Sequence, residues 1–167
     1  NVDVLLIDLQ DIGARTYTYI STAVLTMRAV AAAGGGRRVV VLDRPNPIDG
    51  VHVQGPTLDL GLTSFIGALP VPLRHGMTLG ELARYANAQL AIHARLAVVP
   101  LAGWRREMWF DGTGLPWVRP SPNMPDLASA THYPGLVLFE ATNVSVGRGT
   151  PIAFQVLGAP WLDPARV

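Results

Sequence analysis

Three acidic residues each follow a short apolar run of the sequence: Asp8, Asp43 and Glu140. In open α/β sheets, ligands bind beyond the carboxyl ends of the strands, so acids at these positions are expected to converge on one edge. The simpler alternative is that each acid only caps the turn or helix that follows it. Three such acids, each with an arginine and further polar residues downstream, favour a binding or catalytic site.

Glu140 is the acid best suited to proton transfer, because it closes the apolar run Leu136–Phe139. A carboxyl group at the end of a buried strand is expected to have a raised pKa, as a general acid requires. The same position equally suits a fixed hydrogen-bond acceptor, either for substrate hydroxyl groups or for Arg148.

Arg74 and His75 indicate a second kind of contact. They precede Thr78-Leu-Gly-Glu81, a capping box in which the Thr and Glu side chains satisfy backbone N–H groups at the start of a helix. Because a helix N-terminus attracts anions, both residues are expected to contact a ligand, although helix entry alone explains them as well. The four histidines form no close pair and no HExxH motif, so no metal site is predicted.

The composition excludes several classes of protein. The 167 residues are 49% hydrophobic, enough for the core of one ordinary domain, and the net charge of +1 gives little attraction for nucleic acid. The chain has no cysteine and no lysine, which excludes thiol nucleophiles, Cys-ligated zinc, Walker A loops and Schiff bases. No GxSxG motif is present, and no GxGxxG follows the first apolar run. No apolar run reaches the ~18–20 residues of a transmembrane helix.

The elements that position these residues follow from apolar periodicity. Val2–Ile7 and Arg37–Leu42 are expected to be buried strands, and residues 16–33 show helical spacing up to three glycines. This strand–helix–strand order predicts a parallel α/β sheet. Further along we expect an irregular connection over 43–72, a helix from Thr78, a strand over 96–101, a short helix over 126–132 and a strand over 136–139.

Five motifs, in order between residues 4 and 161, give the chain a resemblance to a known family. They are Asp8-Leu-Gln-Asp-Ile-Gly-Ala-Arg15 with Tyr17 and Tyr19; Asp43-Arg-Pro-Asn-Pro-Ile48; Pro72-Leu-Arg-His-Gly-Met-Thr78; Arg119-Pro-Ser-Pro-Asn-Met-Pro125; and Phe139-Glu140 with Thr142-Asn143, Gly147-Arg-Gly-Thr150 and Gly158-Ala-Pro-Trp161. Together these motifs resemble the YbbC/NamZ family of exo-β-N-acetylmuramidases.

The resemblance implies a bacterial glycoside hydrolase that removes N-acetylmuramic acid from the non-reducing end of peptidoglycan fragments, in cell-wall turnover and recycling. It implies an α/β fold with a Rossmann-like, mostly parallel sheet flanked by helices, and no cofactor. The expected substrates are muropeptides or disaccharides derived from peptidoglycan, with no nucleic-acid partner. Family members are often exported, so a periplasmic or extracellular location is expected rather than a cytoplasmic one.

Family members are longer than this chain. The resemblance therefore implies that residues 1–167 are a partial Rossmann-like catalytic domain, without the family's N-terminal segment and C-terminal domain. The family's Pro-Glu-His-Gly motif, whose glutamate is the leading candidate for the catalytic acid, is expected upstream of residue 1, so the fragment alone is expected to be inactive. Glycoside hydrolysis uses two carboxyl groups, and the candidates for the second are Glu140, Asp8 and Asp11. A substrate-assisted route stays open.

Muramic acid differs from N-acetylglucosamine by its lactyl carboxylate, a group that the planar fork of an arginine matches. The resemblance indicates four candidates, of which one or two are expected to bind this group: Arg15, Arg44, Arg74 and Arg148. The other expected substrate contacts are Tyr17, Asp43, Asn46, His75, Asn123 and Asn143.

A second function stays open on the residues alone, namely a sugar- or peptidoglycan-binding α/β module without catalysis. The scarcity of glutamate and the tryptophan-bearing stretch 104–117 fit such a module. Turnover of a chromogenic muramic acid glycoside separates the two functions. A nucleotide-binding domain is disfavoured, because the glycine fingerprint that cradles a pyrophosphate is missing.

Overall fold

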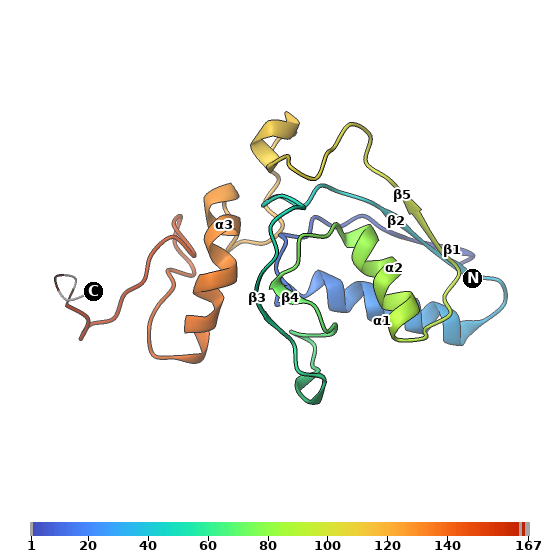
Figure 1. The fold of residues 1–167 in the computed structure, drawn as a ribbon, viewed down its shortest axis with the longest axis horizontal. Helices are drawn as coiled ribbons and strands as arrows, with labels where there is room; N and C mark the ends of the chain where they lie inside the picture. The colour runs from blue at the N-terminus through green and yellow to red at the C-terminus, as the bar shows by residue number, and fades with distance from the viewer. Residues whose placement is uncertain (1, 164, 166–167) are drawn as a thin grey trace. The chain divides into compact units, whose positions relative to one another are not determined.

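The computed structural model describes residues 2–163 and 165 of the chain. These residues form two compact units, divided between Leu115 and Pro116 (Figure 1). The described part of the N-terminal unit holds a parallel three-stranded sheet, a two-stranded sheet and two α-helices, and that of the C-terminal unit holds one α-helix. The prediction of an α/β fold with a parallel sheet is confirmed.

Strands β1 (Val4–Ile7), β2 (Arg38–Leu42) and β5 (Leu96–Val99) run parallel in the order β1-β2-β5. The first two confirm the predicted strand–helix–strand start, and the third confirms the strand predicted from residue 96. Ile7 pairs with Val41, which pairs with Val98 on its other side, so alternate residues of the three strands share a face.

Helices α1 (Tyr19–Ala33) and α2 (Leu79–Gln89) confirm the two helices predicted in this unit. Helix α1 ends at Gly34, whose positive φ of 59° is typical of a residue that stops a helix. Helix α2 begins with the predicted capping box. Thr78 Oγ1 accepts a hydrogen bond from the Glu81 N–H at 3.2 Å, and the Glu81 carboxylate accepts one from the Thr78 N–H at 3.0 Å.

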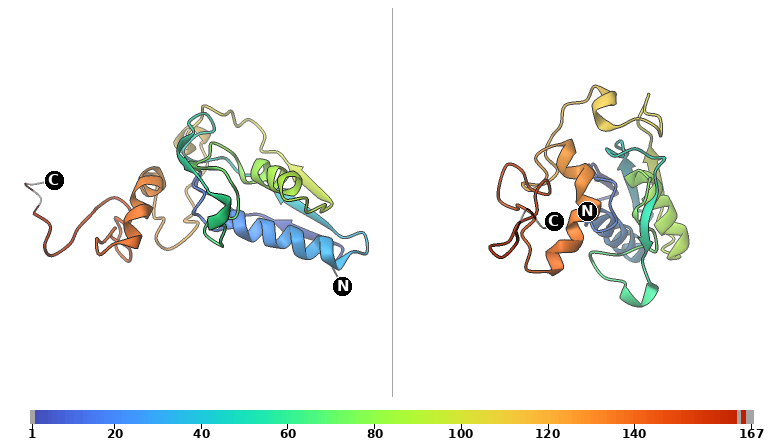
Figure 2. Two further views of the ribbon diagram at one scale, coloured as in Figure 1. Left: turned by 60° about the horizontal axis from the view of Figure 1, so that its bottom comes forward. Right: turned by 60° about the vertical axis from the view of Figure 1, so that its left-hand side comes forward.

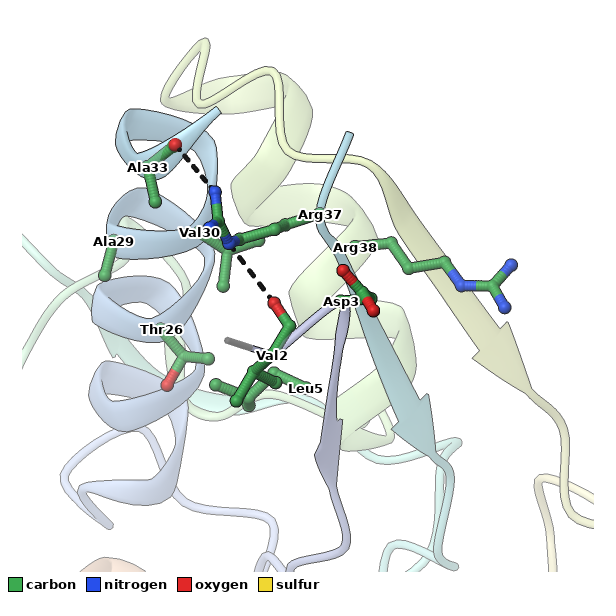
Figure 3. A pocket seen from close by; sticks show the side chains of 9 residues that line it. All are labelled: Val2, Asp3, Leu5, Thr26, Ala29, Val30, Ala33, Arg37 and Arg38. Carbon is green, nitrogen blue, oxygen red and sulfur yellow. Dashed lines mark hydrogen bonds between the residues drawn. The ribbon is translucent and has the colours of Figure 1, made fainter. Parts of the chain in front are cut away.

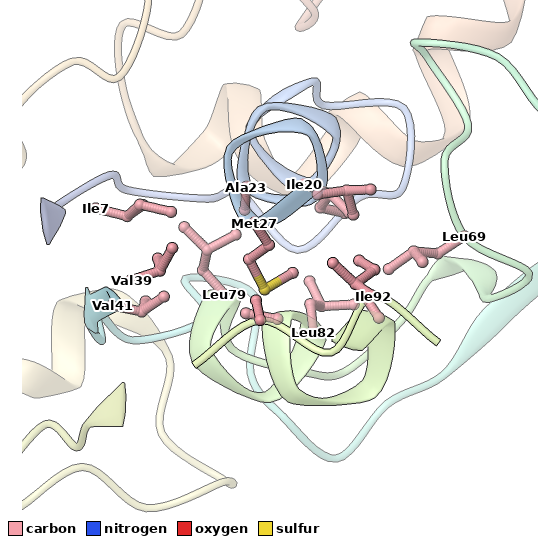
Figure 4. Close-up of a cluster of buried hydrophobic side chains, with 14 of the residues drawn as sticks. Ile7, Ile20, Ala23, Met27, Val39, Val41, Leu69, Leu79, Leu82 and Ile92 are labelled. Atoms are coloured by element: carbon pink, nitrogen blue, oxygen red, sulfur yellow. The ribbon is translucent and has the colours of Figure 1, made fainter. Parts of the chain in front are cut away.

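The hydrophobic core lies between these two helices and one face of the parallel sheet (Figure 4). Ile7, Val39 and Val41 come from the strands, Met27 from α1 and Leu82 from α2, and all are at most 5% exposed. Full burial of an aliphatic side chain of this size contributes about 1.5–3 kcal/mol relative to exposure. The shared core therefore fixes the strand ends relative to the start of α2.

The other face of the sheet is apolar but largely uncovered. Leu6 is 60% exposed and Val99 is 50% exposed, whereas Val40, which pairs with Leu6, is half-buried. The expectation that the first strand is buried is therefore wrong in this structure, because α1 and α2 both pack on the face that carries Ile7. An all-parallel sheet normally has both faces covered.

Strand β1 also forms an edge of the sheet, since its one strand partner among the described residues is β2. Beside it lies an apolar trough of about 290 Å³, lined among others by Val2, Leu5 and Val30 (Figure 3). Arg37 crosses the end of this trough and donates to the carbonyl oxygens of Val2 at 3.2 Å and Ala33 at 2.9 Å.

A small antiparallel sheet interrupts the connection over 43–72, which was expected to be irregular. Strand β3 (Gln54–Thr57) pairs with β4 (Pro72–Arg74), and a 3-10 helix, η1 (Leu60–Leu62), lies between them. The sequence did not indicate β3, because a Gly-Pro pair in its middle breaks the alternation that marks a strand. A second 3-10 helix, η2 (Phe110–Thr113), lies near the end of this unit.

In the C-terminal unit, helix α3 (Leu127–Leu136) continues directly into the 3-10 helix η3 (Val137–Ala141), drawn in orange in Figure 2. The predicted helix over 126–132 is confirmed and is longer, but the predicted strand over 136–139 is wrong. A short apolar run does not by itself distinguish a strand from a helical segment. Within the residues that the structure describes, no helix has the length and apolar character needed to cross a bilayer.

Candidate active site

The carboxyl ends of β1 and β2 bring together Asp8 and Arg44. Arg44 Nε donates a hydrogen bond to Asp8 Oδ1 at 2.6 Å, and the two side chains remain 43% and 49% exposed for Arg44 and Asp8 respectively. They therefore form a charged pair that is open to solvent at the sheet edge where ligands bind in α/β proteins. This is the meeting of polar groups that the strand ends predict.

Asp43, the other predicted strand-end acid of this unit, supports helix α2 instead. Its carboxylate accepts from the Thr78 hydroxyl at 2.7 Å and from the Gly80 N–H at 2.8 Å. A Cβ atom on Gly80 would lie 2.7 Å from this carboxylate, so the approach requires glycine. Here the capping alternative describes the geometry, and the negative charge also suits the positive end of the helix dipole.

Asp11 and His75 form a buried pair below the surface of this edge. Both are under 5% exposed, and His75 Nε2 lies 3.5 Å from Asp11 Oδ2. His75 Nδ1 accepts from the Met77 N–H at 3.1 Å, so the imidazole proton belongs on Nε2, facing the carboxylate. Asp11 Oδ2 also accepts from the Gly13 N–H at 2.8 Å, while Asp11 Oδ1 has no hydrogen-bond partner among the described residues.

Asn46 links the loop after β2 to the loop before α2. Its amide group donates to the Met77 carbonyl at 3.0 Å and accepts from the Ile48 N–H at 3.1 Å. Gly13 packs against this amide at a φ of +82°, and a Cβ atom there would lie 2.5 Å from Asn46 Oδ1. Together with the His75 N–H, which donates to the Gly13 carbonyl at 3.3 Å, these bonds interlock three loops.

Arg15 is committed to the small antiparallel sheet. Its Nη1 donates to the carbonyl oxygens of Pro56 at 2.9 Å and Val71 at 2.6 Å. Burial lowers the pKa of Arg15, which is the direction expected for a cation taken out of water. Tyr17, two residues further along the chain, is buried and makes an edge-to-face contact with Tyr19, with ring centroids 5.0 Å apart.

Arg74 is held on several sides. It donates to Gln54 Oε1 at 3.0 Å, to Asp49 Oδ2 at 2.9 Å and to the Ile48 carbonyl, and it lies over the Trp109 ring at 5.4 Å. Burial opposes the ionisation of Asp49, but hydrogen bonds to its carboxylate and the charge of Arg74 together lower the pKa of Asp49. The donors of Arg74 therefore have partners within the protein, and its side chain is only 13% exposed.

Arg106 has a structural role that the sequence did not indicate. It donates to the Glu81 carboxylate at 2.6 Å, to the Gly76 carbonyl at 2.6 Å and to the Gly50 carbonyl at 3.0 Å. These partners lie between 25 and 56 residues away along the chain, so no local pattern reveals them. Arg106 thereby fastens the start of α2 to the loop that follows Asp49.

In the C-terminal unit, Glu140 and Arg148 form an ion pair. Arg148 donates from Nε to Glu140 Oε1 and from Nη2 to Glu140 Oε2, the latter at 3.1 Å, and its guanidinium lies over the Phe154 ring at 5.1 Å. Hydrogen bonding to Glu140 raises the pKa of Arg148 despite its partial burial. Glu140 lies on η3 and not at the end of a strand, so the strand-end argument made for this residue is wrong.

Asn123 and Asn143 also belong to the C-terminal unit. Asn123 Oδ1 accepts from the Gly149 N–H at 2.9 Å, which ties two loops of the unit together, and Asn143 is exposed. Across the described ranges, no three His, Asp or Glu side chains gather as a metal ion would require.

Two protein-family models match the chain. Residues 1–128 match the N-terminal model of the exo-β-N-acetylmuramidase NamZ, and residues 131–167 match its C-terminal model. A similar curated protein is the peptidoglycan β-N-acetylmuramidase NamZ of Bacillus subtilis (strain 168), which is 50% identical over all 167 residues. The chain spans 40% of the length of that relative.

Two solved structures are similar to the chain, both of DUF1343 family proteins from Bacteroides fragilis NCTC 9343. They superpose with TM-scores of 0.88 and 0.84, at 40% and 42% sequence identity. The matches cover 96% and 95% of this chain, and 42% and 44% of the two solved chains. The likeness in fold therefore extends over nearly the whole of this chain.

Proposed function

The chain belongs to the NamZ family of exo-β-N-acetylmuramidases, and from this premise we propose that it is part of an enzyme that releases N-acetylmuramic acid from the non-reducing end of peptidoglycan fragments. The observation that carries the proposal is the 50% identity, over all 167 residues, to a protein named as a peptidoglycan β-N-acetylmuramidase. Because the chain spans 40% of that relative, the activity is proposed for the full-length protein.

The geometry favours Asp8 as the second carboxyl group of this reaction. It is half exposed at the carboxyl end of β1, and only one of its oxygens is bonded within the described residues. A carboxylate held in this way can face an oxocarbenium-like sugar or activate a water molecule. The general acid is proposed to be the glutamate of the family's Pro-Glu-His-Gly motif, which is not among these 167 residues.

The other two candidates fit the second carboxyl group less well. Asp11 is buried beneath the sheet edge and faces His75, so it is better placed to position the loop than to touch a sugar. Both oxygens of Glu140 accept hydrogen bonds from Arg148.

The proposed substrate is a muropeptide or disaccharide derived from peptidoglycan, and the proposed place of action is outside the cytoplasm. The interlocked loops around Asn46 would hold the Asp8–Arg44 pair rigid beneath the bound sugar. Rigid placement of this kind is what allows a charged group to stabilise a transition state without reorganising.

The direct test is hydrolysis of para-nitrophenyl β-N-acetylmuramic acid by the full-length protein, with the N-acetylglucosamine analogue as the control substrate. We expect selective turnover of the muramic substrate and a loss of kcat of about 100-fold or more in Asp8→Asn. Asp111→Asn, which changes an exposed acid on η2, is the matched control and should keep full activity.

One result would contradict the proposed activity, and another would contradict only the proposed role of Asp8. A folded full-length protein that binds peptidoglycan fragments without hydrolysing either substrate would be the non-catalytic binding module. An Asp8→Asn variant with unchanged kcat would remove Asp8 from the reaction while leaving the family activity intact.

A further inference from the structure

Recognition of muramic acid requires a group that reads its lactyl carboxylate, since this carboxylate is what N-acetylglucosamine lacks. The question rests on the proposed function and concerns the same sheet edge. A bidentate contact to this carboxylate needs an arginine with two parallel N–H groups that do not already donate hydrogen bonds within the protein. Four arginines lie in the family motifs, and the structure separates them by the partners they already have.

We infer that Arg44 is the residue that binds the lactyl carboxylate and gives the enzyme its preference for muramic acid. Its Nε is bonded to Asp8, and its Nη1 and Nη2 have no hydrogen-bond partner within the range that the structure describes. These two nitrogens form the end of the guanidinium fork, which is the edge that accepts a carboxylate in a bidentate arrangement. The side chain is 43% exposed, so a ligand can reach that edge.

The other three arginines have their charge or their donors engaged. Arg15 donates to two backbone carbonyl oxygens and is buried enough to lower its pKa. Arg74 is held by Asp49 and is 13% exposed. Arg148 already holds a carboxylate, that of Glu140, with Nε and Nη2. Arg74 and Arg148 would each have to break an ion pair of the fold to bind a substrate carboxylate. The Nε of Arg15 has no hydrogen-bond partner among the described residues, but it is buried, so a ligand cannot approach that edge of the guanidinium.

The N-terminus of α2 is the other place near this edge where an anion is expected to bind, and it is already capped. Asp43 accepts from the Gly80 N–H at 2.8 Å, and Thr78 accepts from the Glu81 N–H at 3.2 Å. The Asp43 carboxylate also accepts from the backbone N–H of Arg44 at 3.1 Å. The helix end therefore offers little to a substrate anion and instead fixes the backbone from which the Arg44 side chain extends.

Asp8 gives this arrangement its specificity. By holding Nε, it restrains the guanidinium while leaving Nη1 and Nη2 to a ligand. A sugar whose lactyl group contacts Arg44 would then have its reacting carbon near Asp8, the proposed second carboxyl group. The same pair would thus select the substrate and place it for reaction.

The test is a double-mutant cycle in the full-length protein, in which Arg44 and the lactyl carboxylate of the substrate are each altered, singly and together, and kcat/KM is compared. Wild type, Arg44→Gln and Arg44→Lys are each assayed with three para-nitrophenyl glycosides: β-N-acetylmuramic acid, its lactyl methyl ester, and β-N-acetylglucosamine. We expect Arg44→Gln to lower kcat/KM for the muramic substrate by about 10- to 100-fold, the range for a lost hydrogen bond to a charged group. The ester and the glucosamine substrate should lose less turnover, by a common factor that reports the lost bond to Asp8, and Arg44→Lys should be intermediate for the muramic substrate.

Arg28→Gln, on the exposed side of α1, is the matched control and should leave all three values unchanged. The inference is overturned if Arg44→Gln keeps the preference of the wild type for the charged muramic substrate. It is also overturned if all three substrates lose turnover equally in a variant that melts like wild type, because Arg44 would then only support Asp8. If the wild type hydrolyses none of the three, the proposed function fails and this inference fails with it.

Discussion

Replacement of Asp43 by alanine should destabilise the protein rather than abolish its chemistry. The change removes a carboxylate that accepts from the Thr78 hydroxyl, the Gly80 N–H and the Arg44 N–H at 2.7, 2.8 and 3.1 Å. The hydroxyl can turn to another acceptor, but the two backbone N–H groups are left without one. With net values of about 1.5–3 kcal/mol for a hydrogen bond to a charged group, taken at the lower end, the expected cost is about 3–5 kcal/mol.

Asp43→Asn separates charge from geometry at the same position. Its amide oxygen can still accept from the Gly80 and Arg44 N–H groups, while its amino group can donate to Thr78 Oγ1. We therefore expect a cost of only about 1 kcal/mol and nearly full activity. Asp111→Ala, on the exposed surface of η2, is the control for removing an acid and should stay within about 0.5 kcal/mol of wild type.

The assay is urea denaturation of the full-length variants, followed by circular dichroism, together with kcat measured under conditions where each variant is folded. An Asp43→Ala variant with an unchanged urea midpoint and no activity would refute the reasoning, because Asp43 would then act on the substrate and not on the helix. A variant with a lower midpoint and a kcat within a few-fold of wild type would support it.

Three further changes test other parts of the structure. Asp49→Asn removes a carboxylate whose pKa is lowered on folding. This carboxylate stabilises the folded state at pH values above the ordinary Asp pKa of 3.8, and the stabilisation is lost as the pH falls below it. The urea midpoint of the variant should therefore fall less than that of wild type between about pH 7 and pH 3. Gly13→Ala places a Cβ atom 2.5 Å from Asn46 Oδ1 at a φ of +82° and should cost more than about 2 kcal/mol in the same assay, so a neutral effect would contradict the interlocked loops. Glu140→Gln should change the free energy of unfolding by only about 0–1 kcal/mol, because the partner Arg148 is half exposed and can be solvated, and activity should be retained. A loss of kcat beyond about 100-fold would show that Glu140 takes part in catalysis.

The sequence predicts the elements whose side chains alternate or repeat regularly. The first two parallel strands, α1 and the capped helix α2 follow from apolar spacing and from the Thr78–Glu81 box. The prediction failed over 136–139 and at β3. Four apolar residues fit a strand and a helical segment equally well, and a Gly-Pro pair hides a strand whose pairing depends on residues far along the chain.

The candidate site was predictable only in part for a related reason. That Asp8 and the loop after β2 share an edge follows from the parallel order of the strands, which the sequence indicates. Whether a polar side chain on that edge faces solvent or the interior depends on contacts between distant residues. Asp11 and Arg15 lie within seven residues of Asp8, yet one pairs with buried His75 and the other with the β3–β4 region.

The uncovered face of the parallel sheet has a practical consequence for handling these residues. Leu6 and Val99 present exposed apolar surface, and the edge of β1 that no described strand pairs with offers backbone donors and acceptors to another strand. Surfaces of both kinds promote self-association and poor solubility. Residues 1–167 produced alone should therefore form oligomers or inclusion bodies, and a soluble preparation will need either the longer polypeptide or a charged side chain placed at Leu6.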